Sequence, residues 1–231
     1  MSGASASRSQ HAVRLLALLH VCGESVGGND PDGMVRVIRS EKRLQALDFW
    51  LRNPDYLADE LVTGVEKGTL DEEYLDVAAK LLTDPEPSWN HFPMPKWFYG
   101  AYEAVDDAFA LLQAHGLARV KRRGTPGNRL QNQFFLTDFG AKKADELNTT
   151  DRLDWYPKQA KLVALVARDD TGTQLKQRQY AQESYAQAVW GSDIGSISDQ
   201  VETRLAAMRV PARFGSTTAS STSAARTGKE A

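Results

Sequence analysis

Cysteine is nearly absent from this chain of 231 residues, which contains one copy, Cys22. A lone cysteine excludes an intramolecular disulfide and any zinc or iron–sulfur site built from several cysteines. Such sparse use of cysteine is typical of a reducing compartment, and we expect a cytoplasmic protein. Free cysteines are usually buried and inert, so we interpret Cys22 as a core residue.

An excess of either charge is also missing, because 28 Lys and Arg residues stand against 30 Asp and Glu residues, a net charge of −2. This balance excludes a histone-like polycation and gives the whole molecule no attraction to nucleic acid or to an anionic membrane. Long hydrophobic runs are missing too, since residues 12–22 are interrupted by Arg14 and His20 and are too short to span a bilayer. The segment instead predicts an amphipathic helix, with Arg14 and His20 off the centre of its apolar stripe. We expect the protein to have no contact with a membrane.

Catalytic motifs are a third absence. The sequence has four histidines, and none has the spacing of a catalytic or metal site. His20 and Cys22 are two residues apart, and such neighbours point to different faces of a helix. Gly-x-Ser-x-Gly and His-Glu-x-x-His are absent, and the glycine pairs lack the context of a phosphate loop. We therefore expect a non-enzymatic protein with no cofactor and no metal, although a catalytic site assembled from distant residues would leave no such motif.

Helical periodicity dominates what is present, and it predicts a mainly α fold with a small β-hairpin. Ser40 is suited to cap a helix, and Pro54 is suited to the first turn of the next one. The C-terminal helices are a candidate homodimer interface. The predicted organisation is a flexible N-terminus at 1–10, an N-terminal helical region at 11–83, a central unit at 84–150, C-terminal helices at 151–210 and a disordered tail at 211–231.

The central unit has the sharpest pattern. Gly116 is suited to the left-handed conformation at a helix end, and Thr137 or Asp138 can cap the helix that follows. The predicted order is a helix at 98–115, a strand at 117–123, a turn at 124–131, a strand at 132–137 and a closing helix that ends at Leu147.

Two segments of this unit, 111–123 (LLQAHGLARVKRR) and 134–147 (FFLTDFGAKKADEL), resemble the winged-helix family of DNA-binding domains, in particular MarR- and PadR-like regulators. The resemblance covers residues 98–148. It implies a winged-helix unit at 84–150 flanked by N-terminal and C-terminal helices, and a DNA-binding transcriptional regulator or DNA-associated factor. The matching residues are the Gly-Leu pair Gly116 and Leu117, the basic strand 119–123, and the Leu-Thr-x-x-Gly helix start at Leu136, Thr137 and Gly140.

Positive charge gathers at the predicted wing, because residues 108–137 contain no acidic side chain. A basic hairpin can contact duplex phosphates without reading sequence, which makes double-stranded DNA the predicted partner. The alternative is that Lys and Arg simply keep an edge strand soluble. The predicted DNA-binding residues are Arg119, Lys121, Arg122, Arg123 and Arg129.

Acidic residues on the helix before the wing argue against sequence-specific contact with DNA bases. The helix before the wing would enter the major groove, and its outer face carries Glu103, Asp106 and Asp107, with only Gln113 suited to contact a base. Residues 48–86 add eleven acids against three basic residues, a net charge of −8. This acidic region suits contact with a basic partner protein or a second copy of the chain, or it forms ordinary solvated helix faces.

Aromatic residues are dense over 89–102, where prolines hold the chain extended. Such a segment suits partner binding, or it forms a flap that closes the N-terminal helices onto the central unit. It supports the alternative function, a protein–protein adaptor that uses the winged-helix fold without sequence-specific DNA reading. The predicted partner-binding residues are Trp89, Phe92, Trp97 and Tyr99.

Overall fold

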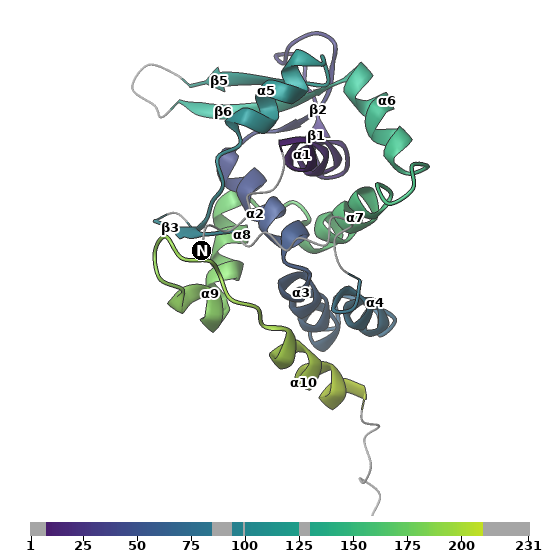
Figure 1. Cartoon of the computed structure of the whole chain (residues 1–231), viewed down its shortest axis with the longest axis vertical. Coiled ribbons are helices and arrows are strands. Elements are labelled where there is room, and N and C mark those ends of the chain that lie inside the picture. Colours follow the sequence, from purple (N-terminus) through teal and green to yellow (C-terminus); the bar gives the residue numbers. More distant parts are fainter. Residues whose placement is uncertain (1–7, 85–93, 99, 125–129, 210–231) are drawn as a thin grey trace, which may run out of the picture.

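The computed structural model describes residues 8–84, 94–98, 100–124 and 130–209. This part of the chain is mainly helical, with ten helices and a small antiparallel sheet, which confirms the predicted class (Figure 1). None of these helices is long and apolar enough to cross a membrane.

The N-terminal part forms four helices and two strands. Ser40 caps α2 as predicted, accepting a hydrogen bond of 3.1 Å from the Arg43 backbone N–H, and Pro54 begins α3. Pro54 is tolerated there because the first turn of a helix has no use for its missing N–H group. The elements are α1 (Arg8–Cys22), β1 (Glu24–Ser25), β2 (Met34–Ile38), α2 (Glu41–Arg52), α3 (Pro54–Glu66) and α4 (Tyr74–Leu81).

The middle of the chain forms two hairpins and two helices. The predicted helix over 98–115 is wrong at its start, because α5 begins at Asp106 and residues before it form a short hairpin. The hairpin of β5 and β6 and the helix after it are confirmed. The elements are β3 (Lys96–Trp97), β4 (Gly100–Ala101), α5 (Asp106–Ala114), β5 (Ala118–Arg123), β6 (Gln131–Thr137) and α6 (Asp138–Leu147).

The two turns of the Gly-Leu and Leu-Thr-x-x-Gly motifs have the predicted geometry. Gly116 has a φ of +68°, the left-handed conformation that glycine adopts without a steric penalty. The Thr137 hydroxyl caps α6 by accepting a hydrogen bond of 2.8 Å from the Gly140 N–H. The same hydroxyl lies 2.7 Å from the Gly116 carbonyl oxygen, so it joins both motifs.

The main sheet has the strand order β1-β2-β6-β5, and its pairs are antiparallel. Ile38 of β2 and Val120 of β5 lie opposite Phe134 of β6 and share the face that packs on the helices. The strand β2 is not foreseen from the sequence, although its β-branched residues between turns are typical of a strand. The N-terminal region therefore contributes to the same sheet as the hairpin.

The C-terminal part forms α7 (Trp155–Ala167), α8 (Gly172–Ala181), α9 (Glu183–Gln187) and α10 (Ser198–Arg209). The backbone is extended at Gln182, which separates α8 from α9. In Figure 1, α7 and α8 lie beside α2 in the middle of the molecule, and α10 lies by α3 and α4 at the far end from the sheet. The buried residues Val201 and Leu205 of α10 belong to the core of this same chain.

The helix α1 is the centre of the core. Leu15, Leu18 and Leu19 are fully buried between the sheet and the helices α2, α5, α6 and α7. Arg14, which the sequence places off the centre of the apolar stripe, is also fully buried. A charged side chain at that depth requires partners of opposite charge.

Candidate functional site

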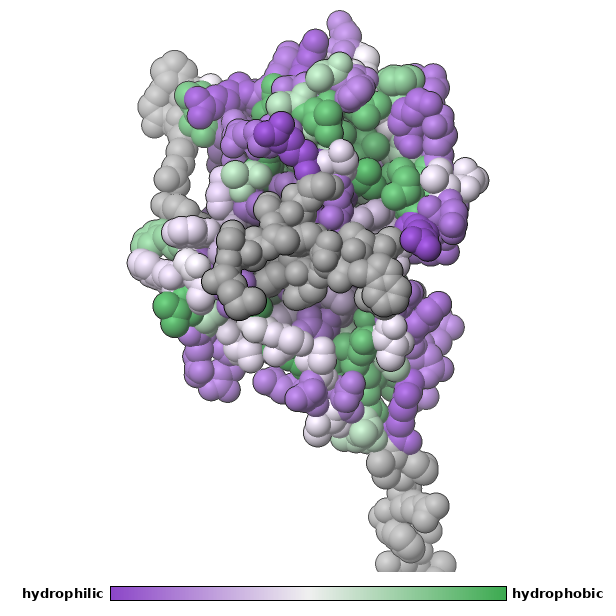
Figure 2. Space-filling view, in the orientation of Figure 1, coloured by the Kyte–Doolittle hydropathy of each residue, from purple (hydrophilic) through white to green (hydrophobic). Residues whose placement is uncertain are grey.

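The predicted basic strand β5 presents its cations on two faces of the sheet. Side chains alternate along a strand, so Arg119 and Lys121 lie on the face opposite to Val120 and the core, and Arg122 lies on the same side as Val120. Arg119 and Arg122 are exposed, and Lys121 is half-buried. The hairpin projects from the molecule, with hydrophilic residues beside its turn (Figures 1 and 2). Arg129 lies outside the described residues.

Arg123 lies beside an acidic side chain, and in the described part of the chain the other three cations of β5 do not. Its guanidinium lies 3.3 Å from the Asp30 carboxylate and donates to the Asn29 carbonyl oxygen. Asp30 also accepts hydrogen bonds from Arg39 of 3.1 and 2.8 Å, and this guanidinium holds the pKa of the Asp30 carboxyl well below its usual range. Arg123 thus fastens the loop after β1 to the sheet, and its charge is shared with an acid.

The helix α5 offers little for reading bases. Asp106 and Asp107 are exposed in its first turn, and Asp107 lies 3.1 Å from Arg8. The Gln113 side-chain oxygen accepts a 2.8 Å hydrogen bond from the Val120 N–H, so this amide is occupied by the start of β5. Glu103 precedes the helix and turns inward, which corrects the expectation that it faces outward.

Glu103 belongs to a buried charge network that joins α1, α2 and the segment before α5. Arg14 donates to Asp48 at 3.1 Å and lies 3.6 Å from the Glu103 carboxylate, which also contacts Arg52. The Gln45 side-chain amide donates to the Glu103 carbonyl oxygen at 2.6 Å and accepts a hydrogen bond of 3.1 Å from the Glu103 N–H. Two arginines and two carboxylates balance to zero charge, which is the condition for burying them.

His11 lies against the same network, with its Nε2 atom 3.8 Å from an Asp48 oxygen. Ligand atoms of His11, Asp48 and Glu103 all lie within 4.8 Å of one another, a spacing that could hold a metal ion. The two arginines already neutralise both carboxylates, and a divalent cation there would have two guanidinium charges beside it. The group is therefore better explained as a charge network than as a metal centre.

Acidification is expected to destabilise the protein through His11. Burial, the largest cause, lowers the pKa of His11, so the folded state holds this imidazole neutral. The unfolded chain takes up a proton near its ordinary pKa of about 6.5 and is favoured as pH falls below that value. The loss of stability stops growing once pH is below the lowered pKa. Urea unfolding of wild type and His11→Gln at about pH 7.5 and pH 5.5 measures the effect.

The matched control for this pH effect is His115→Gln, because His115 is exposed at the end of α5. We expect His11→Gln to reduce the pH dependence of the free energy of unfolding and His115→Gln to leave it unchanged. Equal slopes in wild type and His11→Gln would show that other groups cause the acid sensitivity.

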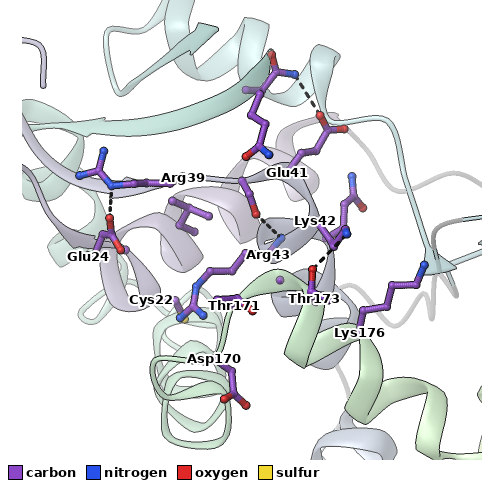
Figure 3. A pocket seen from close by; sticks show the side chains of 18 of the residues that line it. Cys22, Glu24, Arg39, Glu41, Lys42, Arg43, Asp170, Thr171, Thr173 and Lys176 are labelled. Carbon is purple, nitrogen blue, oxygen red and sulfur yellow. Dashed lines mark hydrogen bonds and ion pairs between the residues drawn. The ribbon is translucent and has the colours of Figure 1, made fainter. Parts of the chain in front are cut away.

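A cleft of about 1010 Å³ opens between the sheet and the N-terminal ends of α2 and α8 (Figure 3). Among the residues that the structure describes, six basic and four acidic ones line it, an excess of two positive charges. Arg122 of the hairpin is one of them, so β5 faces both the outer surface and this cleft. The basic residues are Arg39, Lys42, Arg43, Arg122, Arg168 and Lys176.

The sequence alone does not reveal this cleft. Lys42 and Arg43 follow the Ser40 cap and belong to a mildly basic stretch, which is a weak signal. Lys176 comes from a helix more than 130 residues later, and only the packing of α8 on α2 brings it to the same place.

The predicted acidic region meets positive charge within its own chain. Three arginines of α8 and α10 lie against acids of α3 and α4, part of the surface proposed for a partner protein, a second copy of the chain or solvent. This part of the acidic surface is thereby occupied by the chain itself. The pairs are Arg178–Glu60 at 2.5 Å, Arg204–Asp59, Arg204–Glu66 at 2.7 Å and Arg209–Asp76.

The aromatic segment divides between core and surface. Met94 is fully buried, as a flap requires, but Trp97 is 50% exposed and Phe98 is 63% exposed. Phe98 forms an edge contact with Trp190, which is 65% exposed, at 5.5 Å between ring centroids. The predicted partner-binding residues Trp89, Phe92 and Tyr99 lie outside the described residues.

Cys22 packs against the core as interpreted from the sequence, and its thiol lies 3.5 Å from the Ala160 carbonyl oxygen. Burial raises the pKa of this thiol to about 12, so it is protonated at neutral pH and a poor nucleophile.

Comparisons with protein-family models, curated proteins and solved structures give no match for the chain.

Proposed function

We propose that this chain is a non-enzymatic DNA-binding protein of winged-helix type that contacts duplex phosphates through the hairpin of β5 and β6. The observation that carries the proposal is the projecting hairpin with Arg119, Lys121 and Arg122 on its first strand. Among the described residues, no acidic side chain lies within 4.0 Å of the charged groups of these three.

The order of elements supports a winged-helix arrangement. The segment α5–β5–β6–α6 has the helix, strand, strand and helix that the sequence resemblance implies. Its two motifs serve the geometry directly, since Gly116 turns the chain out of α5 and Thr137 caps α6. The strand β2 extends the sheet by pairing with β6 on the side opposite to β5.

The charges favour phosphate contact without base reading. A side chain that neutralises a phosphate releases bound counterions and gains affinity whatever the sequence. The helix α5 presents Asp106 and Asp107 outward, and these carboxylates would be repelled by the DNA backbone in the major groove. We therefore propose a DNA-associated factor with weak sequence preference, in which the wing supplies most of the affinity.

The decisive variant is Arg119→Gln with Lys121→Gln. These side chains lie on the outer face of β5, and changing them leaves the Arg123–Asp30 contact intact. Loss of two phosphate contacts is expected to weaken binding on the order of 10- to 100-fold at 0.1 M salt. Fluorescence anisotropy with a labelled duplex measures the dissociation constant of the full chain.

The matched control is Lys158→Gln with Lys161→Gln, which removes the same charge from two exposed positions of α7. We expect this control to bind within about twofold of wild type, because its lysines are away from the hairpin. Equal weakening of both double variants would mean that the hairpin has no special role, and a wild type that does not bind duplex at low salt would refute the proposal.

The exposed aromatics favour a second candidate, a protein–protein adaptor. Trp97, Phe98 and Trp190 are exposed, and Phe98 packs against Trp190. Contact with water is unfavourable for such large apolar side chains, and a partner protein would cover them. A partner that stays bound to the chain after nuclease treatment would favour this function, and one that is released would favour contact through DNA.

A further inference from the structure

We propose that the cleft between the sheet and the helices α2 and α8 binds a small organic phosphate. This inference goes beyond the proposed DNA contact and does not depend on it. The cleft has a volume of about 1010 Å³, at the upper end of what small-molecule sites occupy. It is lined by the ends of β2 and β6, the first turns of α2 and α8, and β4.

Two lysines from distant parts of the sequence stand on the same side of this cleft. Figure 3 shows Lys42 at the start of α2 beside Thr173, and Lys176 further along α8. Lys42 donates to the Thr173 hydroxyl at 3.4 Å, and within the described residues no carboxylate lies within 4.0 Å of its ammonium. The Lys176 ammonium lies 5.2 Å from the centre of the Tyr180 ring. Both lysines line the same cleft.

The arginines of the cleft add positive charge that the nearby acids only partly cancel. Arg43 donates to the Arg168 carbonyl oxygen at 2.8 Å, and Arg122 reaches the cleft from β5. Among the four lining acids, Glu24 is paired with Arg39, and Asp170 lies 2.9 Å from Arg178, a residue outside the lining. The remaining excess of basic over acidic side chains favours the binding of an anion in this cleft.

The backbone fixes this geometry. A Cβ atom at Gly172 would lie 2.5 Å from the Arg43 nitrogen and 2.9 Å from the Lys42 carbonyl carbon, so only glycine permits this contact. The N-terminal ends of α2 and α8 consequently meet at the cleft, and their dipoles add positive potential to that of the lysines. Glu41 is directed to Asn132 at 3.1 Å, away from Lys42 and Thr173 (Figure 3).

Apolar residues give room for more than a bare ion. Val21, Ile38, Ala46 and Ala101 line the same cleft, and the half-exposed Tyr102 ring is beside them. A ligand that fits both features has a phosphate for the lysines and a compact organic group for the apolar wall. Phosphate suits the site better than a single carboxylate, because its second negative charge is matched by the excess of basic residues in the lining.

Isothermal titration of the full chain at constant ionic strength tests this site, with phenyl phosphate as the probe and benzoate as its singly charged carboxylate counterpart. We expect saturable binding of phenyl phosphate and at least tenfold weaker binding of benzoate. Lys42→Ala with Lys176→Ala is expected to weaken phenyl phosphate binding at least tenfold. Lys158→Ala with Lys161→Ala removes equal charge from α7 and is expected to leave it within twofold of wild type.

Three outcomes would overturn the proposal. Wild type could fail to bind phenyl phosphate at millimolar concentration, both double variants could weaken it equally, or benzoate could bind as tightly. Thermal melting of each variant without ligand verifies folding, and the single change Lys42→Gln provides a milder variant with the same expected direction. Duplex binding is measured separately, so failure here leaves the proposed function standing.

Discussion

Replacing Arg14 with methionine is expected to reduce the free energy of unfolding by about 3–5 kcal/mol. The Arg14 side chain is fully buried, and its Nε atom donates to Asp48 at 3.1 Å. Its loss leaves the Asp48 carboxylate buried, with Arg52 at 3.7 Å as its remaining cation. Arg14 and Arg52 hold the pKa of Asp48 below its ordinary value against the opposing effect of burial, so this acid stays charged. Urea unfolding followed by circular dichroism measures the change.

The chain provides a matched control in the exposed pair of Arg8 and Asp107, whose side chains are 74% and 73% exposed. Arg8→Met is expected to cost less than about 1 kcal/mol, because water and salt screen such a pair. The double change Arg14→Met with Asp48→Leu is expected to recover much of the lost stability, since it removes both charges of this buried pair and leaves Arg52 with Glu103. A loss of under 1 kcal/mol for Arg14→Met alone would contradict the role given to this network.

Gly140→Ala is expected to destabilise the chain by about 3 kcal/mol, although alanine favours helices more than glycine does. A Cβ atom at Gly140 would lie 2.0 Å from the Leu117 carbonyl oxygen and 2.8 Å from its carbon. That carbonyl cannot move freely, because it accepts hydrogen bonds of 3.1 Å from the Thr137 N–H and from the Thr137 hydroxyl. Separating α6 from the hairpin would therefore break two hydrogen bonds as well as the packing.

The control for this substitution is Gly28→Ala. A Cβ atom at Gly28 would meet nothing within 4 Å, and the backbone there does not have a positive φ. This change is expected to be neutral or slightly stabilising, since it only restricts the unfolded chain. Thermal melting compares the two variants, and similar melting temperatures would mean that the close contact at Gly140 carries no energetic weight.

Local chemistry was readable from the sequence where one residue determines it. Gly116, Thr137 and the Ser40 cap have the roles that their residue types predict, because a turn or a cap depends on a few neighbouring backbone groups. The hairpin strands followed from the same kind of local pattern. The start of α5 was misplaced because Phe98 and Tyr102 continue the helical spacing by chance while their backbone lies outside the helix.

Long-range pairing could not be read in the same way. Arg14 looks like a break in an apolar stripe, and only the arrival of Asp48 from α2 explains its burial. The strand β2 is short, and its partner β6 lies about a hundred residues later. The cleft depends on the contact of Gly172 with the start of α2, which joins segments about 130 residues apart. Such sites depend on the packing of the whole chain.

The salt dependence of duplex binding tests the central claim most directly. The logarithm of the association constant of the wild type is expected to fall linearly with the logarithm of salt concentration, at about 0.9 per phosphate contact. In the variant Arg119→Gln with Lys121→Gln, the slope should be shallower by about 1.8, while Lys158→Gln with Lys161→Gln should match the wild type. Identical slopes in all three proteins, or no measurable binding at low salt, would contradict contact between DNA and the hairpin.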